Sequence, residues 1–153
     1  MTTLFVNRLT VIDFSFLDPV AGLLGESWLV DIELDGSLDH QAMVLDFGDV
    51  KKQVKQCIDQ EFDHRLLIPT RHAHCRIQQQ ENRCDIHFQL ASGETVVHSS
   101  PNSAIALIES ESITPESLSQ AIIHRLQPQL PDNIQGLRLR LYGEPIAGAW
   151  YRY

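Results

Sequence analysis

An aspartate followed directly by a histidine, Asp63-His64, is the pair of side chains in this sequence best suited to moving protons. An imidazole titrates near neutral pH, so a histidine beside a carboxylate can accept or release a proton under physiological conditions. The same pair also suits a structural role, because a histidine at the C-terminal end of a helix is stabilised by the helix dipole, with the aspartate as its partner. The residue types alone favour neither interpretation.

Histidines and cysteines gather in a second segment, within His72-Ala73-His74-Cys75 and Cys84-Asp85-Ile86-His87. If these stretches form a hairpin that turns near Glu81, Cys75 lies opposite His87, and the pair supplies two convergent metal ligands. Two ligands are too few for a closed structural zinc site. A polar hairpin face without a metal is therefore the alternative interpretation of this region.

The three cysteines, Cys57, Cys75 and Cys84, are an odd set without the spacing of a disulfide framework. This usage agrees with a reducing compartment. Cys57 falls on the apolar stripe of a predicted helix, which favours a place in the core over a role as nucleophile.

Patterns of apolar residues predict the elements that position these groups. Alternation of apolar and polar residues indicates strands, and helical spacing of apolar residues indicates two helices. The first helix begins at Asp49 and ends near His64, and the second is capped by Thr114 with Pro115 in its first position. The predicted strands cover residues 4–17, 27–34, 42–47, 76–80, 84–90, 95–98, 104–108 and 137–142.

Strands joined by short turns predict an α+β fold, in which an antiparallel sheet carries two amphipathic helices on one face. The length of 153 residues suits a single domain over residues 1–153. Such a sheet leaves edges, which pairing between subunits of a ring would cover.

The composition excludes several classes of partner. A formal net charge of -8 argues against nucleic acid, which requires clustered lysine and arginine, and against anionic lipid surfaces. No apolar run is long enough to span a membrane, and the N-terminus lacks the pattern of a secretion signal. We therefore expect a cytoplasmic protein.

Several motifs together resemble 6-pyruvoyl-tetrahydropterin synthase and the bacterial 6-carboxytetrahydropterin synthases. The motifs that carry the resemblance span residues 30–36 (VDIELDG), 43–51 (MVLDFGDVK), 62–69 (FDHRLLIP), 114–118 (TPESL) and 142–145 (YGEP). The resemblance implies the tunnelling fold, an antiparallel four-stranded sheet with two helices. The residues between 71 and 108 are similar to the extra β-hairpin of longer members. The resemblance also implies that the chains assemble into trimers and hexamers with active sites between subunits.

The family reaction eliminates from the side chain of dihydroneopterin triphosphate, using a zinc ion held by three histidines. A cysteine acts as base with help from an Asp-His pair. At the three histidine positions this sequence has Asp18, Leu24 and Glu26, and at the cysteine position it has Val20. We therefore expect no zinc cofactor. The alternatives for the two carboxylates are an oxygen-ligand site for a hard cation and solvated loop acids.

Other family positions are partly retained. The Asp63-His64 pair is present. Glu144 is similar to the glutamate that anchors the pterin through paired hydrogen bonds, although alignment on the following proline places Gly143 at the anchor position, where a bulge could restore the direction of the side chain. The resemblance of the second helix start implies ligand contacts from Thr114 and Glu116.

Three hypotheses follow. The leading one is a homo-oligomer, trimer or hexamer, that binds a pterin- or purine-like ligand and has lost the zinc-dependent lyase activity. The second is an enzyme. It is either a carbon–oxygen lyase of the 6-pyruvoyl- or 6-carboxytetrahydropterin synthase type with an altered active site, or it catalyses another reaction of the tunnelling fold, such as a retro-aldol or hydrolytic step, through Asp63 and His64 with water. The third is a structural partner of a competent paralogue.

Overall fold

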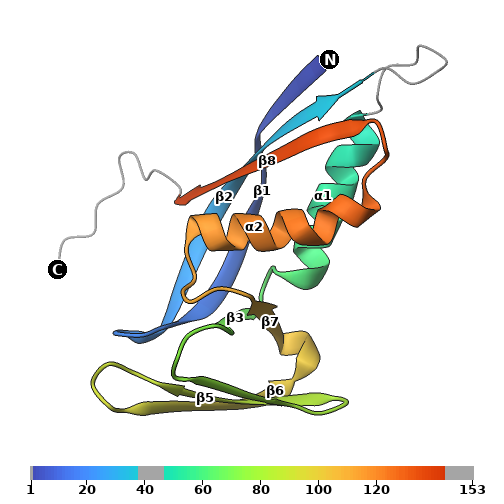
Figure 1. Cartoon of the computed structure of the whole chain (residues 1–153). Helices are drawn as coiled ribbons and strands as arrows, with labels where there is room; N and C mark the ends of the chain where they lie inside the picture. The colour runs from blue at the N-terminus through green and yellow to red at the C-terminus, as the bar shows by residue number, and fades with distance from the viewer. Residues whose placement is uncertain (1, 38–46, 144–153) are drawn as a thin grey trace.

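The structure is a computed structural model, and it describes residues 2–37 and 47–143 (Figure 1). Its longest strand, β1 (Thr2–Asp18), forms an antiparallel hairpin with β2 (Gly22–Gly36). The last strand, β8 (Ile134–Gly143), pairs antiparallel with the other edge of β2. Apolar residues alternate along these strands, and this alternation gives the sheet one buried face.

Two short strands extend the sheet beyond β1. They are β3 (Leu66–Pro69) and β7 (Ile105–Ile108), and β3 pairs parallel with both β1 and β7. The strand order is β7-β3-β1-β2-β8. The α+β class is confirmed, but the sheet has five strands and mixed direction, where four antiparallel strands were expected. Parallel strands need long crossover connections, and here β2 and α1 lie between β1 and β3, while residues 70–104 lie between β3 and β7.

The expected hairpin is present and belongs to a second, three-stranded antiparallel sheet. Its strands are β4 (Cys75–Gln79), β5 (Arg83–Gln89) and β6 (Thr95–Pro101), and the 3₁₀ turn η1 (Asn102–Ala104) leads from β6 into β7. This sheet lies against one end of the main sheet (Figure 1). The two sheets share a hydrophobic cluster of Leu17, Leu66, Ile68, Cys84, Ile86, Phe88 and Ile105.

Both helices pack on one face of the main sheet, as predicted (Figure 1). Helix α1 (Phe47–Glu61) begins two residues before the predicted Asp49, so Phe47 is helical and does not end a strand. The rest of the predicted strand at 42–47 lies outside the described residues. Helix α2 (Pro115–Leu126) is followed by the 3₁₀ turn η2 (Gln127–Gln129). Neither of these α-helices is long and apolar enough to cross a membrane.

Candidate functional site

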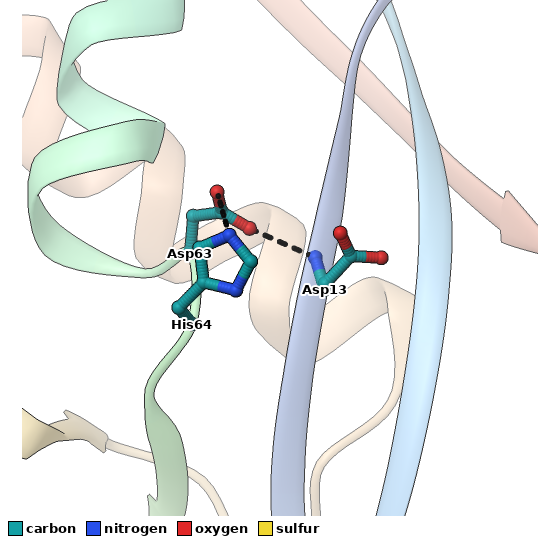
Figure 2. Close-up of side chains that lie close together, drawn as sticks. All are labelled: Asp13, Asp63 and His64. Atoms are coloured by element: carbon teal, nitrogen blue, oxygen red, sulfur yellow. Dashed lines mark hydrogen bonds and ion pairs between the residues drawn. The ribbon is translucent and has the colours of Figure 1, made fainter.

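Asp63 and His64 lie where α1 ends and the chain turns toward β3, beside the middle of β1 (Figure 2). Three hydrogen bonds attach this junction to β1. The backbone N–H of His64 donates to the carbonyl oxygen of Asp13 (2.7 Å), and the N–H of Ser15 donates to the carbonyl of Arg65 (3.1 Å). In the third, the N–H of Asp13 donates to Oδ1 of Asp63 (2.9 Å). The junction is thus held at a fixed position on the strand.

The side chains of Asp13, Asp63 and His64 form a compact cluster at this junction. Nε2 of His64 lies 3.3 Å from Oδ2 of Asp63, and the histidine side chain is 76% exposed whereas that of Asp63 is 16% exposed. One ligand atom from each of the three residues lies within 4.8 Å of the other two. Ser27 donates a hydrogen bond to Oδ1 of Asp13. An exposed imidazole beside a carboxylate can transfer protons. Two carboxylates and one imidazole are also ligand types that bind divalent cations.

The backbone of His64 adopts a left-handed conformation, with a φ of 58°. For residues other than glycine this conformation costs roughly 1–2 kcal/mol, because Cβ approaches the carbonyl oxygen. The conformation persists here because the same residue bonds to β1 through its N–H and to Asp63 through its ring.

We expect the free energy of unfolding to be about 1 kcal/mol higher for the His64→Gly variant than for the His64→Ala variant. Both variants lack the imidazole, so the comparison isolates the backbone conformation, which glycine adopts without the Cβ clash. Urea unfolding followed by circular dichroism measures the difference. A His64→Ala variant as stable as His64→Gly would contradict a strained backbone at this position.

Asp18 stands at one of the three positions that hold zinc-binding histidines in the family, and here its side chain stabilises the turn between β1 and β2. Its Oδ2 accepts the backbone N–H groups of Val20 (2.9 Å) and Ala21 (2.8 Å). The turn closes at Gly22, whose φ of 83° favours glycine. The structure therefore gives this carboxylate a role in shaping the hairpin end.

The register of β1 and β2 separates Asp18 from Glu26. Glu26 pairs with Phe14, four residues from Asp18 along β1, which corresponds to a separation of about 13 Å at the usual rise per residue. Leu24 pairs with Phe16 between them. The two carboxylates do not converge, so the alternative of a shared oxygen-ligand site at Asp18 and Glu26 is contradicted.

The predicted pairing of Cys75 with His87 is also wrong. Cys75 pairs with Phe88, and His87 pairs with Arg76. The turn occupies residues 80–82, which shifts the register by one residue from the predicted one. Because strand side chains alternate between faces, this shift places Cys75 and His87 on opposite faces of the second sheet.

The histidines before β4 have local roles of their own. Nδ1 of His72 accepts the backbone N–H of His74 (3.2 Å), and the ring of His72 packs 4.9 Å from that of Phe88. Within the described residues, the hairpin brings no group of three metal-ligating side chains together.

The start of α2 is a complete capping box. Oγ1 of Thr114 accepts the N–H of Ser117 (3.0 Å), and Oγ of Ser117 accepts the N–H of Thr114 (2.8 Å). The predicted N-cap is confirmed, and the Thr114 hydroxyl is engaged in capping. Glu116 is exposed in the first turn. Among the described residues, no hydrogen bond or ion pair joins this helix start to the Asp63–His64 pair, and Glu144 lies outside them.

Cys57 is buried, as predicted, with 5% exposure. Burial, and secondarily the nearby carboxylate of Glu61, raise the pKa of its thiol to about 12. Its Sγ lies 3.6 Å from Oε2 of Glu61. A thiol that remains protonated to this extent does not serve as a nucleophile near neutral pH.

Asp13 and Ser27 were not predicted as site residues. Asp13 follows Ile12 and precedes Phe14, so in the sequence it is one polar residue in an alternating strand. Its neighbours in space, Asp63 and His64, are 50 or more residues away along the chain. A sequence signal for the cluster would require the contact between β1 and the end of α1, which no local pattern encodes.

Comparisons with known proteins agree with this architecture. The family model for 6-pyruvoyl tetrahydropterin synthase matches residues 18–153. A protein of Methanocaldococcus jannaschii named "Putative 6-carboxy-5,6,7,8-tetrahydropterin synthase" is 28% identical over 143 residues, which are 90% of this chain and 84% of the relative. The crystal structure of 6-pyruvoyl tetrahydropterin synthase from Plasmodium vivax shares the fold, with a TM-score of 0.72, 18% identity and coverage of 94% of this chain and 92% of that one. The Plasmodium falciparum synthase gives a TM-score of 0.71 at 16% identity, with the same coverage of both chains. The chain therefore belongs to the 6-pyruvoyl tetrahydropterin synthase family.

Proposed function

We propose that this protein binds a pterin- or purine-like heterocycle and does not carry out the zinc-dependent lyase reaction of its family. The observation that carries the proposal is the donor set at the positions that the resemblance assigns to the zinc ligands. Leu24 has no donor atom, and Asp18 uses a carboxylate oxygen to close its own turn. Glu26 is displaced from Asp18 along the hairpin. These residues do not fit a zinc ion, which requires three protein ligands around one point.

Family membership supports the ligand class, since the relatives are named as pterin synthases. The exposed imidazole at the α1–β3 junction supports the location, because a ligand can reach it from solvent. We further propose a homo-oligomer, trimer or hexamer. The sheet ends in β7 and β8, and strand edges of this kind are commonly covered by neighbouring subunits.

The test combines metal analysis, turnover and binding. We expect protein purified without chelators to contain far less than one zinc per chain and to leave dihydroneopterin triphosphate unchanged, also after zinc is added. We expect neopterin to quench or shift the protein fluorescence with saturation. One zinc per chain together with turnover would overturn the proposed loss of activity, and absence of neopterin binding would overturn the ligand class.

A second candidate is an enzyme that uses His64 as acid or base, with Asp63 as its partner. The observation that favours it is the 3.3 Å pair in which the histidine is exposed and the aspartate is largely covered. If this candidate holds, some reduced pterin is converted by the protein, and His64→Ala abolishes the conversion while the fold remains intact. Lack of conversion of any reduced pterin by the unmodified protein would exclude it.

A further inference from the structure

A cavity of 410 Å³ lies where the end of α1 meets α2, β7 and the second sheet. Its volume falls within the range of roughly 300–1,000 Å³ that is usual for small-molecule sites. The apolar residues that line it include Phe62, Ile105 and Ala106, all of them buried, and the polar ones include two arginines, Arg65 and Arg125. In a protein with a formal net charge of -8, this pair of guanidinium groups favours an anionic ligand.

The guanidinium of Arg65 is fixed at the wall of this cavity. Its Nη1 donates to the carbonyl oxygen of Ile105 (3.2 Å), and its Nη2 donates to that of Gln60. Both accepting residues also line the cavity. A guanidinium has five N–H groups, so the two bonds orient it and leave three N–H groups for a ligand. Within residues 2–37 and 47–143 no carboxylate pairs with Arg65, and its positive charge is therefore uncompensated.

The second arginine of the cavity already has an acidic partner. Nη1 of Arg125 lies 3.4 Å from Oε1 of Glu61. The other oxygen of this carboxylate, Oε2, accepts from the thiol of Cys57 (3.6 Å), which holds Glu61 in place. Glu61 thus offsets the charge of Arg125, and the charged residues that line the cavity leave a single positive charge, that of Arg65.

From these contacts we infer that the cavity binds a small organic acid, with its one carboxylate on Arg65 and a short aliphatic body against the apolar residues. A planar carboxylate accepts two parallel, charge-assisted N–H bonds from one guanidinium. A phosphate group carries about 1.5 to 2 negative charges near pH 7, which exceeds the single positive charge that the cavity supplies. None of the described residues of the Asp63–His64 cluster lines the cavity, so this binding is additional to the proposed function.

The experiment uses isothermal titration calorimetry with hexanoate and its neutral counterpart, hexanamide, as probes. For the unmodified protein we expect hexanoate to bind at least about tenfold more tightly, because only the carboxylate forms charge-assisted bonds. Arg65→Gln removes the charge and keeps an amide donor for the backbone carbonyls, and we expect it to weaken hexanoate binding about tenfold. Arg76→Gln makes the same change of charge at an exposed residue of β4 that does not line the cavity, and we expect it to leave the affinity unchanged.

Glu61→Gln tests the charge balance in the opposite direction. This variant removes the carboxylate that neutralises Arg125 and keeps an oxygen acceptor for Cys57, so that the cavity gains a second positive charge. We expect hexanoate to bind several-fold more tightly to this variant. Inorganic phosphate, which we expect to bind the unmodified protein more weakly than hexanoate, should gain more, because the Coulomb energy increases with the charge of the ligand.

Three results would overturn the inference. The first is the absence of hexanoate binding to the unmodified protein, or equal binding of hexanoate and hexanamide. The second is an unchanged affinity for hexanoate in a folded Arg65→Gln variant, or in Glu61→Gln if Arg65→Gln does not fold. The third is tighter binding of inorganic phosphate than of hexanoate by the unmodified protein, which would exclude the carboxylate as the preferred group. The neopterin titration is a separate measurement, so each of these results leaves the proposed function in place.

Discussion

Replacing Phe88 with alanine is expected to lower the free energy of unfolding by about 3–5 kcal/mol. Phe88 is fully buried in the cluster shared by the two sheets, and the ring of His72 packs against it. The loss combines the transfer of the ring from water to the core with the cavity that remains. Equilibrium unfolding in urea measures it.

Phe5 is the matched control, because it is the same residue type with 64% exposure. We expect Phe5→Ala to change stability by no more than about 0.5 kcal/mol. The shared cluster contains Leu17 of β1 as well as residues of β5, so we also expect Phe88→Ala to unfold in one transition. A separate early transition of the second sheet would show that the two sheets fold independently.

Above about pH 9 the protein is expected to lose stability through Cys57. Burial holds the pKa of the folded thiol at about 12, against an ordinary value of 9.0. The unfolded chain therefore releases this proton first as the pH rises, which favours unfolding between these two values and has no effect below them. At about pH 10.5 the expected loss is roughly 2 kcal/mol, since each pKa unit corresponds to about 1.4 kcal/mol.

The Cys57→Ser variant tests this prediction, because serine keeps a donor for Glu61 and does not titrate in this range. The quantity to compare is the difference in unfolding free energy between about pH 8 and about pH 10.5, in each protein. We expect the difference to be smaller in Cys57→Ser. Equal differences in the two proteins would assign the alkaline loss to other groups, such as Cys75 and Cys84, whose pKa values burial also raises.

The elements with local determinants could be predicted from the sequence. The capping box at Thr114 and Ser117 needs only residues within one helical turn. The apolar stripe of α1 placed Cys57 in the core correctly, because helical periodicity specifies a face without reference to the rest of the chain. The α+β class and the family followed from such local patterns.

Features that depend on pairing between distant segments could not be predicted. Strand β3 (Leu66–Pro69) is buried along its whole length, and a short continuous apolar run does not reveal its direction or its partner. The pairing of Cys75 with Phe88, rather than with His87, depends on the position of the turn between β4 and β5, which differs by one residue from the predicted register. Asp13 entered the site through a contact with Asp63 that arises only when α1 is packed on the sheet.

The pairing of β1 with β2 continues without interruption from Thr10 to Asp18, and this continuity has a consequence for insertions and deletions. Ile12 and Phe14 are buried on the helix side, and Asp13 between them belongs to the site. Adding or removing one residue within these strands would exchange the two faces, so the carboxylate would enter the core and an apolar side chain would replace it beside His64. We therefore expect insertions and deletions to be tolerated in the turn at residues 19–21. Within residues 10–18 we expect them to disrupt both the core and the site.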